Sequence, residues 1–214
     1  MENKLYNKLY NKIDTLFTFD QETKQFLYGE FRNPLVKELE NNIWIFTEKI
    51  DGTNFRIIWD GYNLSFGGRT NKSTFNKQQL DYINNTLLKD KEILFEQLFE
   101  DTPVIIYGEL YGAGIQKGDL YGPLNFKVFD VLINDYYLTY EDAFSIADSL
   151  GYEHVPIVLV GTLWEGIKTV ETRDKSFFSD AVLEGLVGQP RGYFKDRRGK
   201  RIIVKIKKRD LGVK

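Results

Sequence analysis

Hydrophobic residues follow two different periods along the chain, and each period predicts one kind of element. Short runs in which apolar, β-branched and aromatic residues alternate with polar ones, or follow one another directly, are typical of strands. Such runs occupy 42–49, 53–59, 62–68, 103–112, 124–139, 156–162, 181–190 and 200–207. Longer segments with apolar residues three or four positions apart predict helices. These segments are 4–17, 75–100, 139–151 and 163–171.

Two Asp-Gly pairs mark places where strands end. Asp60-Gly61 stands between two β-rich runs, which is a strong hairpin signal. Asp51-Gly52 follows "IWIFTEK", an apolar run that ends in a charge pair. Lys49 therefore lies at the end of a buried-looking strand, two residues before a turn. It is either the solvated rim of a sheet or a lysine placed for chemistry.

The segment 139–151 carries helix signals at both ends. Thr139 can cap the first turn, and Glu141 and Asp142 suit that turn because its free N–H groups attract negative charge. Gly151 suits the end, where the backbone commonly becomes left-handed. A helix is therefore predicted here with defined boundaries.

The order of these elements predicts an α+β fold. The strands are spaced too irregularly for a sandwich and are joined in hairpins too often for a parallel βαβ sheet. We expect mainly antiparallel sheets with helices packed outside. The chain has no internal repeat, low-complexity tract or Pro/Gly/Ser-rich linker, so we expect residues 1–214 to form one domain.

The composition is that of a globular protein. The chain has 214 residues, of which 42% are hydrophobic and 15% aromatic. It has no apolar stretch near the roughly 18 residues of a membrane span, and no signal-peptide pattern at its start. Cysteine is absent, which excludes disulfides, thiolate catalysis and cysteine-based zinc sites from this chain. We expect a cytoplasmic protein that does not contact a membrane.

The single histidine narrows the chemistry further. His154 alone excludes a two-histidine metal site within the chain, and we interpret it as an ordinary surface or turn residue. Any chemistry is then expected from Lys, Arg, Glu and Asp.

Charge is spread unevenly along the chain. The net charge is −2, yet residues 191–214 contain eleven Lys or Arg and only two Asp. This basic block includes "RIIVKIK", which reads as a strand and not as a tail. Basic residues fixed on a strand form a positive surface of defined shape, which suits the phosphates of a nucleotide or of a nucleic acid.

Five charged residues lie inside apolar strand patterns. They are Lys49, Glu109, Glu184, Lys205 and Lys207. Each one alone is explained by an antiparallel sheet with one face in water. Lys205 and Lys207 share one face because strand side chains alternate, so they form either a wet stripe or a phosphate clamp.

Taken together, these two carboxylates and three lysines suggest a single reactive groove. Lysines neutralise polyphosphate, and a glutamate can hold Mg²⁺, which takes oxygen ligands and usually keeps several waters. A lysine that is partly desolvated beside other cations becomes nucleophilic. That is the chemistry of an amine that attacks phosphorus.

An ordered series of motifs carries a resemblance to a known superfamily. "EKIDG" at 48–52 resembles motif I, Lys-x-Asp-Gly, of the covalent nucleotidyltransferases, which include polynucleotide ligases and mRNA capping enzymes. The other matches resemble the arginine motif and motifs III, IIIa, IV and V: "SFGGRT" at 65–70, "YGELYGAGIQKG" at 107–118, "FKVFDV" at 126–131, "LEGLVGQP" at 183–190 and "IVKIK" at 203–207. The segment "YGELYGAGIQKG" is similar to motif III of the bacteriophage RNA ligase 2-like family. The resemblance runs from about residue 44 to residue 210.

The resemblance implies how a nucleoside would be held. Lys49 would be the nucleophile that forms a lysyl-AMP phosphoramidate. Glu48 would help seat the adenine amino group, mostly through its backbone carbonyl. Glu109 would hold the ribose, Phe129 would stack on adenine, and Val187 would line the base pocket.

It also implies roles around the phosphates. Asn54 and Arg69 would contact phosphate and orient the RNA end. Glu184 would bind the catalytic metal. Lys205 and Lys207 would contact the α-phosphate and stabilise the transition state, as positioned cations do in phosphoryl transfer.

The family implies an ATP-grasp-like nucleotidyltransferase domain and an ATP-dependent RNA ligase of a bacterial or phage-infected cell. ATP would donate AMP with Mg²⁺ or Mn²⁺ present. AMP would pass from Lys49 to an RNA 5′-phosphate, and a 3′-hydroxyl would then displace it. RNA with these two ends is the expected partner, together with a separate RNA-binding or repair chain.

The sequence departs from the superfamily after motif V. Only seven residues follow Lys207, so we expect neither the OB-fold domain of DNA ligases and capping enzymes nor the helical C-terminal domain of the RNA ligase 2-like enzymes. Two alternatives stay open: a nucleotidyltransferase with another acceptor, such as DNA ends or a cap, and a non-catalytic module that binds RNA ends. The intact set of lysines and glutamates argues against the second, because a pure binder has no need of a nucleophile.

Overall fold

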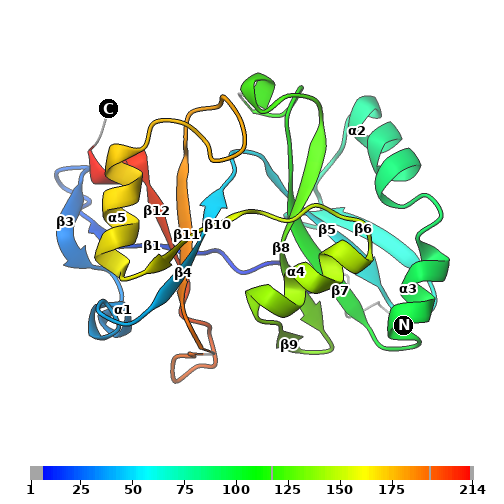
Figure 1. The fold of residues 1–214 in the computed structure, drawn as a ribbon, viewed down its shortest axis with the longest axis horizontal. Coiled ribbons are helices and arrows are strands. Elements are labelled where there is room, and N and C mark those ends of the chain that lie inside the picture. The colour runs from blue at the N-terminus through cyan, green and yellow to red at the C-terminus, as the bar shows by residue number, and fades with distance from the viewer. Residues whose placement is uncertain (1–6, 117, 193, 213–214) are drawn as a thin grey trace. The chain divides into compact units, whose positions relative to one another are not determined.

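The computed structural model describes residues 7–116, 118–192 and 194–212, and the chain divides into two compact units (Figure 1). Unit 1 consists of the described part of Met1–Asn11 together with Asp51–Val155. Unit 2 consists of Lys12–Ile50 and the described part of Pro156–Lys214. Each unit has a five-stranded sheet of its own.

The sheet of unit 1 is antiparallel throughout. Its strands, in spatial order, are β6 (Leu64–Gly68), β5 (Thr53–Trp59), β7 (Val104–Tyr111), β8 (Asn125–Ile133) and β9 (Tyr136–Tyr137). β5 and β6 are joined by the Asp60-Gly61 turn, in which Asp60 Oδ1 accepts hydrogen bonds from the N–H groups of Tyr62 and Asn63 at 3.0 and 2.8 Å. The predicted hairpin is confirmed.

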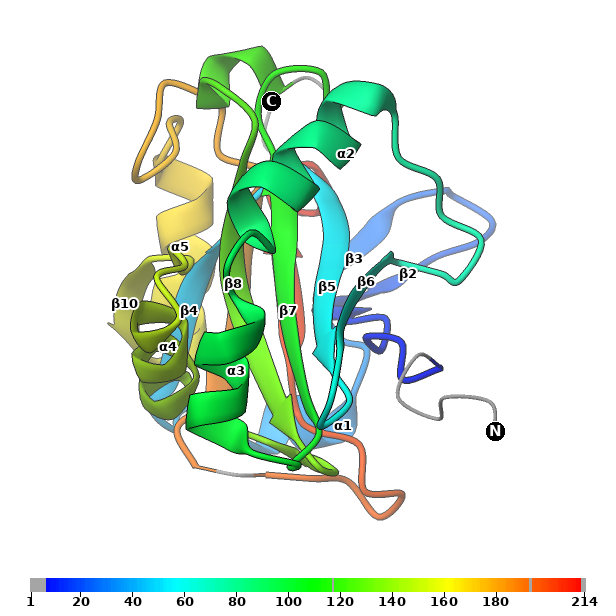
Figure 2. The same cartoon turned by 90° about the vertical axis from the view of Figure 1, so that its right-hand side faces the viewer.

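Helices cover this sheet and complete its core. α2 (Lys77–Tyr82), the π-helical η1 (Ile83–Leu87) and α3 (Glu92–Phe99) run along one face, as Figure 2 shows. The ring of Phe95 in α3 packs 6.2 Å from that of Trp59 in β5. α4 (Tyr140–Ser149) packs against β8, and a short 3₁₀ turn, η2, spans Gly118–Tyr121.

The sheet of unit 2 is antiparallel except at one edge. Its strands, in spatial order, are β1 (Asp14–Thr15), β12 (Val204–Lys207), β11 (Gly185–Pro190), β4 (Trp44–Lys49) and β10 (Ile157–Gly161). β1 pairs in parallel with β12. A separate hairpin, β2 (Phe17–Phe19) with β3 (Phe26–Phe31), precedes the short helix α1 (Pro34–Glu38). The 3₁₀ turn η3 (Lys208–Leu211) follows β12 directly.

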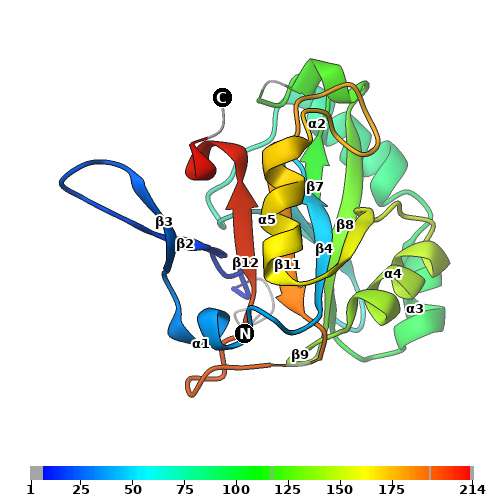
Figure 3. The same cartoon turned by 60° about the vertical axis from the view of Figure 1, so that its left-hand side comes forward.

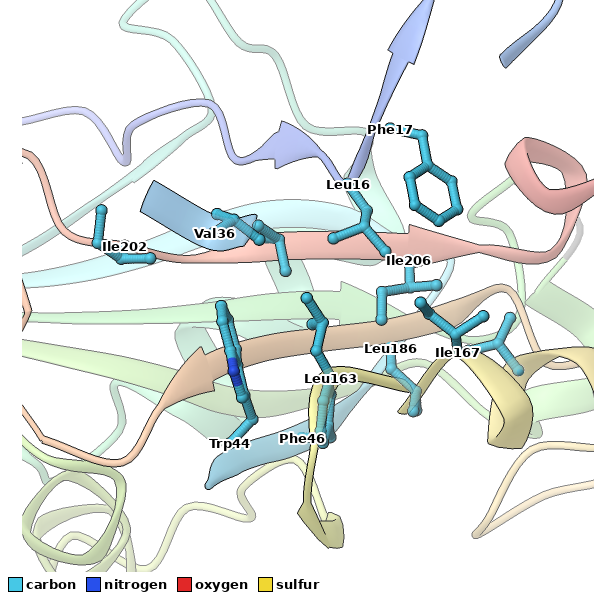
Figure 4. Packing of buried hydrophobic residues seen from close by; sticks show 12 residues of the cluster. Leu16, Phe17, Val36, Trp44, Phe46, Leu163, Ile167, Leu186, Ile202 and Ile206 are labelled. Atoms are coloured by element: carbon cyan, nitrogen blue, oxygen red, sulfur yellow. The ribbon is translucent and has the colours of Figure 1, made fainter. Parts of the chain in front are cut away.

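Helix α5 (Leu163–Thr172) covers one face of the unit 2 sheet. Figure 4 shows the buried side chains that meet there, from β4, β11, β12 and α5: Trp44, Phe46, Leu186, Ile206, Leu163 and Ile167. Strand side chains alternate between faces, so the residues that come between these point to the other side. Because the apolar side chains face α5, Lys49, Lys205 and Lys207 lie on the opposite face of the sheet.

The helix predicted for 4–17 is wrong over its described part. Residues 7–13 form no helix, and β1 and β2 follow; residues 4–6 lie outside the described residues. Leu16 and Phe17 are both buried, and β1 bonds to β12. The backbone pairing of β1 with β12 and the burial of the adjacent residues Leu16 and Phe17 outweigh the weak helical period of this segment.

The other predicted elements are confirmed, with changes at their boundaries. The predicted helix at 75–100 is interrupted near Asp90, which has the left-handed φ of 58°. Thr139 caps α4 by accepting a hydrogen bond from the N–H of Asp142 at 3.2 Å, and Gly151 after it has φ 70°. The α+β class with antiparallel sheets and flanking helices is also confirmed. Within the part of the chain that the structure describes, no helix is both long and apolar enough to cross a membrane.

Candidate active site

Strands β4 and β12 of unit 2 place lysines on the face opposite α5, and β11 lies between these two strands. Lys49 of β4, Gly185 of β11 and Lys207 of β12 stand directly across from one another. In the next row of the same face, Val187 stands across from Lys205. Residues directly across adjacent strands share a face, so three lysines converge where the sequence pattern placed them.

Glu184 joins two of these lysines. Its Oε2 lies 2.6 Å from Lys49 Nζ, and its Oε1 lies 2.5 Å from Lys207 Nζ. The three side chains are only 23%, 19% and 12% exposed for Lys49, Glu184 and Lys207. The sequence placed Glu184 within a strand, but it directly precedes β11. From this position one carboxylate bridges both ammonium groups.

Gly185 makes this arrangement possible. A Cβ at this position would lie 2.0 Å from the carbonyl oxygen of Ile206 and 2.8 Å from the Cα of Lys207. Both obstacles are backbone atoms, which cannot rotate away. β11 and β12 therefore approach as closely as only glycine allows.

Lys205 is the least compensated cation of the cluster. Burial lowers the pKa of Lys205, and the charges of Lys207, Lys49 and Lys12 lower it further, while Asp210 opposes them. Among the described residues, no carboxylate lies within ion-pair distance of Lys205 Nζ. A phosphate placed here would relieve the repulsion between the lysines.

Glu48 and Val187 flank the lysines on the two faces of the sheet. Glu48 is buried, and its Oε2 accepts a hydrogen bond from the N–H of Phe177 at 2.7 Å. Its side chain thus holds the loop that follows α5, which agrees with a ligand contact made through the backbone. Val187 is half-buried beside Lys205. Both remain predicted contributors to a base pocket.

Unit 1 carries the other predicted site residues. Asn54 of β5 stands across from Glu109 of β7. Asn54 Oδ1 is buried and has no hydrogen-bond partner in the described structure, which is uncommon for a buried polar atom. Arg69 directly follows β6 and is exposed.

Phe129 occupies a bulge in unit 1. The pairing of β7 with β8 shifts register there, so Phe129 is the extra residue of β8. Its half-buried ring meets that of Tyr10 edge-on at 4.9 Å. Stacking of Phe129 on adenine stays a prediction. The single histidine, His154, stacks on Phe144 at 4.1 Å, in agreement with an ordinary structural role.

The donor groups of unit 2 fit a divalent metal ion that is also bound by the phosphates of a substrate. Among the described residues, no three carboxylate or histidine side chains gather into a metal cage of their own. Glu184 offers one carboxylate beside lysines that attract phosphate. Mg²⁺ is commonly held by one or two carboxylates together with substrate phosphates and water, and this site can supply such a set.

Sequence reasoning missed two features of this region. One is the β2–β3 hairpin, whose alternating "FTF" before the polar "DQETK" was a strand-and-turn signal. The other is Asp210 of η3, which is buried beside the basic strand. No local pattern distinguishes Asp210 from an ordinary surface aspartate.

A comparison with protein families tests the resemblance that these motifs carry. The profile described as RNA ligase matches residues 42–207, which is most of the chain. This chain belongs to the RNA ligase family. The match includes every site residue named above except Asp210, and it spans parts of both units. No curated protein sequence matches at a significant level.

Solved structures show that the fold is shared with an RNA ligase from Naegleria gruberi. A mutant of the Naegleria gruberi RNA ligase with ATP and Mn is 19% identical, with a TM-score of 0.63, over 94% of this chain and 60% of that one. The same enzyme with PPi is 17% identical, with a TM-score of 0.61, over 92% of this chain and 59% of that one. The chain therefore spans about three fifths of the length of these relatives.

We predict that Lys205→Met makes unit 2 more stable and the protein less active. At neutral pH the native state holds a charged Lys205 against its lowered pKa, so removing the charge raises the free energy of unfolding. As pH rises, the native wild-type protein releases this proton before the unfolded chain does, so its free energy of unfolding increases. The difference in unfolding free energy between Lys205→Met and wild type therefore becomes smaller. Urea denaturation at about pH 7 and about pH 10 measures this.

Lys168→Met, on the exposed side of α5, is the matched control. An equal midpoint shift in both variants, or no pH dependence of the difference, would contradict the prediction.

Proposed function

We propose that this chain is an ATP-dependent RNA ligase in which Lys49 carries AMP as a lysyl-phosphoramidate. The observation that supports it most is the bridge from Glu184 to Lys49 and Lys207, with Lys205 one row away. A phosphoryl-transfer site needs this combination of a nucleophile, cations for the phosphates and a carboxylate for a metal ion.

The first step forms a nitrogen–phosphorus bond. Nζ of Lys49 attacks the α-phosphorus of ATP as a neutral amine, the bond to the pyrophosphate oxygen breaks, and the amine loses a proton. Glu184 Oε2, at 2.6 Å, is in position to accept that proton. The phosphoramidate nitrogen carries no positive charge, so Glu184 then loses one of its two ammonium partners.

The lysines of β12 stabilise the charge that develops during transfer. Lys207 and Lys205 lie on the face that carries Lys49; strand pairing fixes Lys205 on both sides, through β1 and β11, and Lys207 through β11. Cations held in place before the reaction stabilise a phosphoryl transition state without reorganising during it. A metal ion held by Glu184 would neutralise further charge on the phosphates.

The next two steps move AMP and seal the RNA. The 5′-phosphate of one RNA end attacks the phosphorus of lysyl-AMP, which breaks the nitrogen–phosphorus bond and restores the Lys49 amine. The 3′-hydroxyl of the other end then attacks the activated 5′-phosphate, forms a phosphodiester and releases AMP. We assign Glu109 to the ribose, Phe129, Val187 and Glu48 to adenine, and Asn54 and Arg69 to phosphate and the RNA end.

Family membership and the relatives support this proposal. The chain belongs to the RNA ligase family, and the Naegleria gruberi enzyme of the same fold has been solved with ATP and Mn and with PPi. We extend the proposal to residues 1–214 as a nucleotidyltransferase domain that acts with a separate RNA-binding or repair chain.

The proposal is tested by incubating the purified chain first with labelled nucleotide and then with nucleic acids whose ends can be sealed. With Mg²⁺ and α-labelled ATP we expect a covalently labelled band on a denaturing gel, and little label with GTP. With unlabelled ATP we expect sealing of nicked duplex RNA or of single-stranded RNA bearing a 5′-phosphate and a 3′-hydroxyl.

Matched nicked DNA is the control substrate. Preferential sealing of DNA would assign the acceptor differently, and absence of label with either nucleotide would leave only an RNA-end-binding module.

A further inference from the structure

Unit 2 contains an open groove that the proposed reaction does not use in full. It has a volume of about 730 Å³ and lies between the β2–β3 hairpin on one side and β12 with η3 on the other. Figure 3 shows the hairpin extending beside the end of β12, where η3 begins. Lys205 and Lys207 line it, so the groove is continuous with the lysine cluster.

Positive charge dominates the groove. Lys24 of the hairpin and Arg209 of η3 join the two lysines of β12 along its walls. The opposing carboxylate is Asp210, which is only 9% exposed and whose Oδ2 has no hydrogen-bond partner in the described structure. Arg209 Nε lies 3.5 Å from Asp210 Oδ1, but the Arg209 side chain is 78% exposed, so the other nitrogens of its guanidinium can reach a bound anion. The groove therefore attracts phosphate beyond the α-phosphate position.

The hairpin wall adds aromatic rings to this charge. Phe19, Phe26 and Tyr28 all line the groove. Tyr28 is 54% exposed although it is large and apolar, and its hydroxyl donates a hydrogen bond to Glu171 at 2.9 Å. Its ring also packs 5.1 Å from that of Phe17. Tyr28 is thus an exposed ring held in one orientation.

The tip of the hairpin is fixed by local bonds. Asp20 accepts hydrogen bonds from the N–H of Glu22 at 2.8 Å and from the hydroxyl of Thr23 at 2.7 Å. The backbone N–H of Asp20 donates to the carbonyl of Gln25 at 2.8 Å, which closes the loop. Lys24 is therefore presented by a structured turn.

We propose that this groove binds a single-stranded segment of the RNA substrate next to its reactive end. Lys24 and Arg209 contact consecutive backbone phosphates, and a base stacks on Tyr28. The inference rests on the proposed function, since it names where that substrate lies.

Base stacking on an aromatic ring beside a basic track is the usual way in which proteins hold single strands without reading their sequence. The other source of phosphate near these lysines is the pyrophosphate of ATP. Pyrophosphate has no base, so it would leave Phe26 and Tyr28 without a role.

The test compares RNA binding with self-adenylation in the same variants. Tyr28→Ala is expected to weaken binding of a 5′-phosphorylated single-stranded oligoribonucleotide of about ten residues by about 5- to 150-fold, the range of one stacked base. Lys24→Gln and Arg209→Gln are each expected to reduce the slope of log affinity against log salt by about 0.7, the value for one phosphate contact on a single strand. Fluorescence anisotropy at several salt concentrations measures both effects.

The controls separate the groove from general surface effects. Tyr28→Phe keeps the ring and is expected to bind RNA like wild type. Tyr62→Ala removes an exposed tyrosine, 77% exposed, from unit 1, and Lys168→Gln removes an exposed lysine from α5. Neither is expected to change RNA affinity.

Two outcomes would overturn the inference. One is unchanged RNA affinity and salt slope in all three groove variants. The other is weakened inhibition of self-adenylation by added pyrophosphate with unchanged RNA binding, which would assign the groove to the leaving group. Absence of self-adenylation in wild type, with RNA binding that still depends on Tyr28, would instead refute the proposed ligase while the groove assignment stands.

Discussion

Replacing Lys49 with arginine is expected to abolish covalent labelling of the protein by α-labelled ATP. Arginine stays charged at every accessible pH and cannot offer a free amine to phosphorus, yet its guanidinium can still pair with Glu184. The variant should therefore fold normally and lose only the chemistry. Labelling on a denaturing gel, with circular dichroism to check folding, measures this.

Lys49→Arg also separates the steps of the reaction. RNA that already carries AMP on its 5′-phosphate needs no lysyl-AMP, so we expect the variant to seal such RNA while failing with ATP and ordinary RNA. Lys168→Arg is the control and should label like wild type. Persistent labelling of Lys49→Arg would mean that another residue is the nucleophile, and Lys205 would be the next candidate to replace.

The second large effect is expected from Gly185→Ala. The new Cβ would lie 2.0 Å from the carbonyl oxygen of Ile206, and the native φ of 155° is one that side-chain-bearing residues rarely adopt. Overpacking against backbone together with this strain should lower the free energy of unfolding by about 3 kcal/mol. Urea denaturation followed by tryptophan fluorescence measures the loss.

The same substitution should impair the site in the molecules that still fold. Gly185 stands between Lys49 and Lys207, and moving β11 away from β12 would separate the partners of Glu184. We therefore expect slower self-adenylation even at low temperature. Gly199→Ala is the matched control, because Gly199 has φ 77° but open space around it, so only backbone strain is added. Equal destabilisation by both substitutions would show that the contact with Ile206 does not matter.

Prediction from sequence succeeded where the signal is local. Strand alternation determines that Lys205 and Lys207 share a face, and the Asp60-Gly61 pair determines the hairpin between β5 and β6. The Thr139 cap likewise marks the start of α4. These features depend on neighbouring residues, so the pattern of a few positions is sufficient.

Prediction from sequence failed where a distant segment of the chain determines the local structure. Residues 7–17 have apolar spacing that suits a helix, but β1 pairs with β12, about 190 positions later in the chain, and Leu16 and Phe17 are both buried. The β2–β3 hairpin is a different case, because "FTF" before "DQETK" gave a local signal that was overlooked, while its place on the core depends on distant segments. Its aromatic residues pack on the core beneath α5, which is built mainly from later segments.

The sequence by itself determined the residue types of this site, their order and the family to which they belong. From the sequence, Lys49, Glu184, Lys205 and Lys207 were all predicted to belong to one reactive set. The tertiary structure alone decided that Glu184 bridges Lys49 and Lys207, and that Gly185 provides the close approach this requires. The physical reason is that these contacts join strands far apart in the chain. Their distances depend on how β4, β11 and β12 pair, which no local pattern specifies.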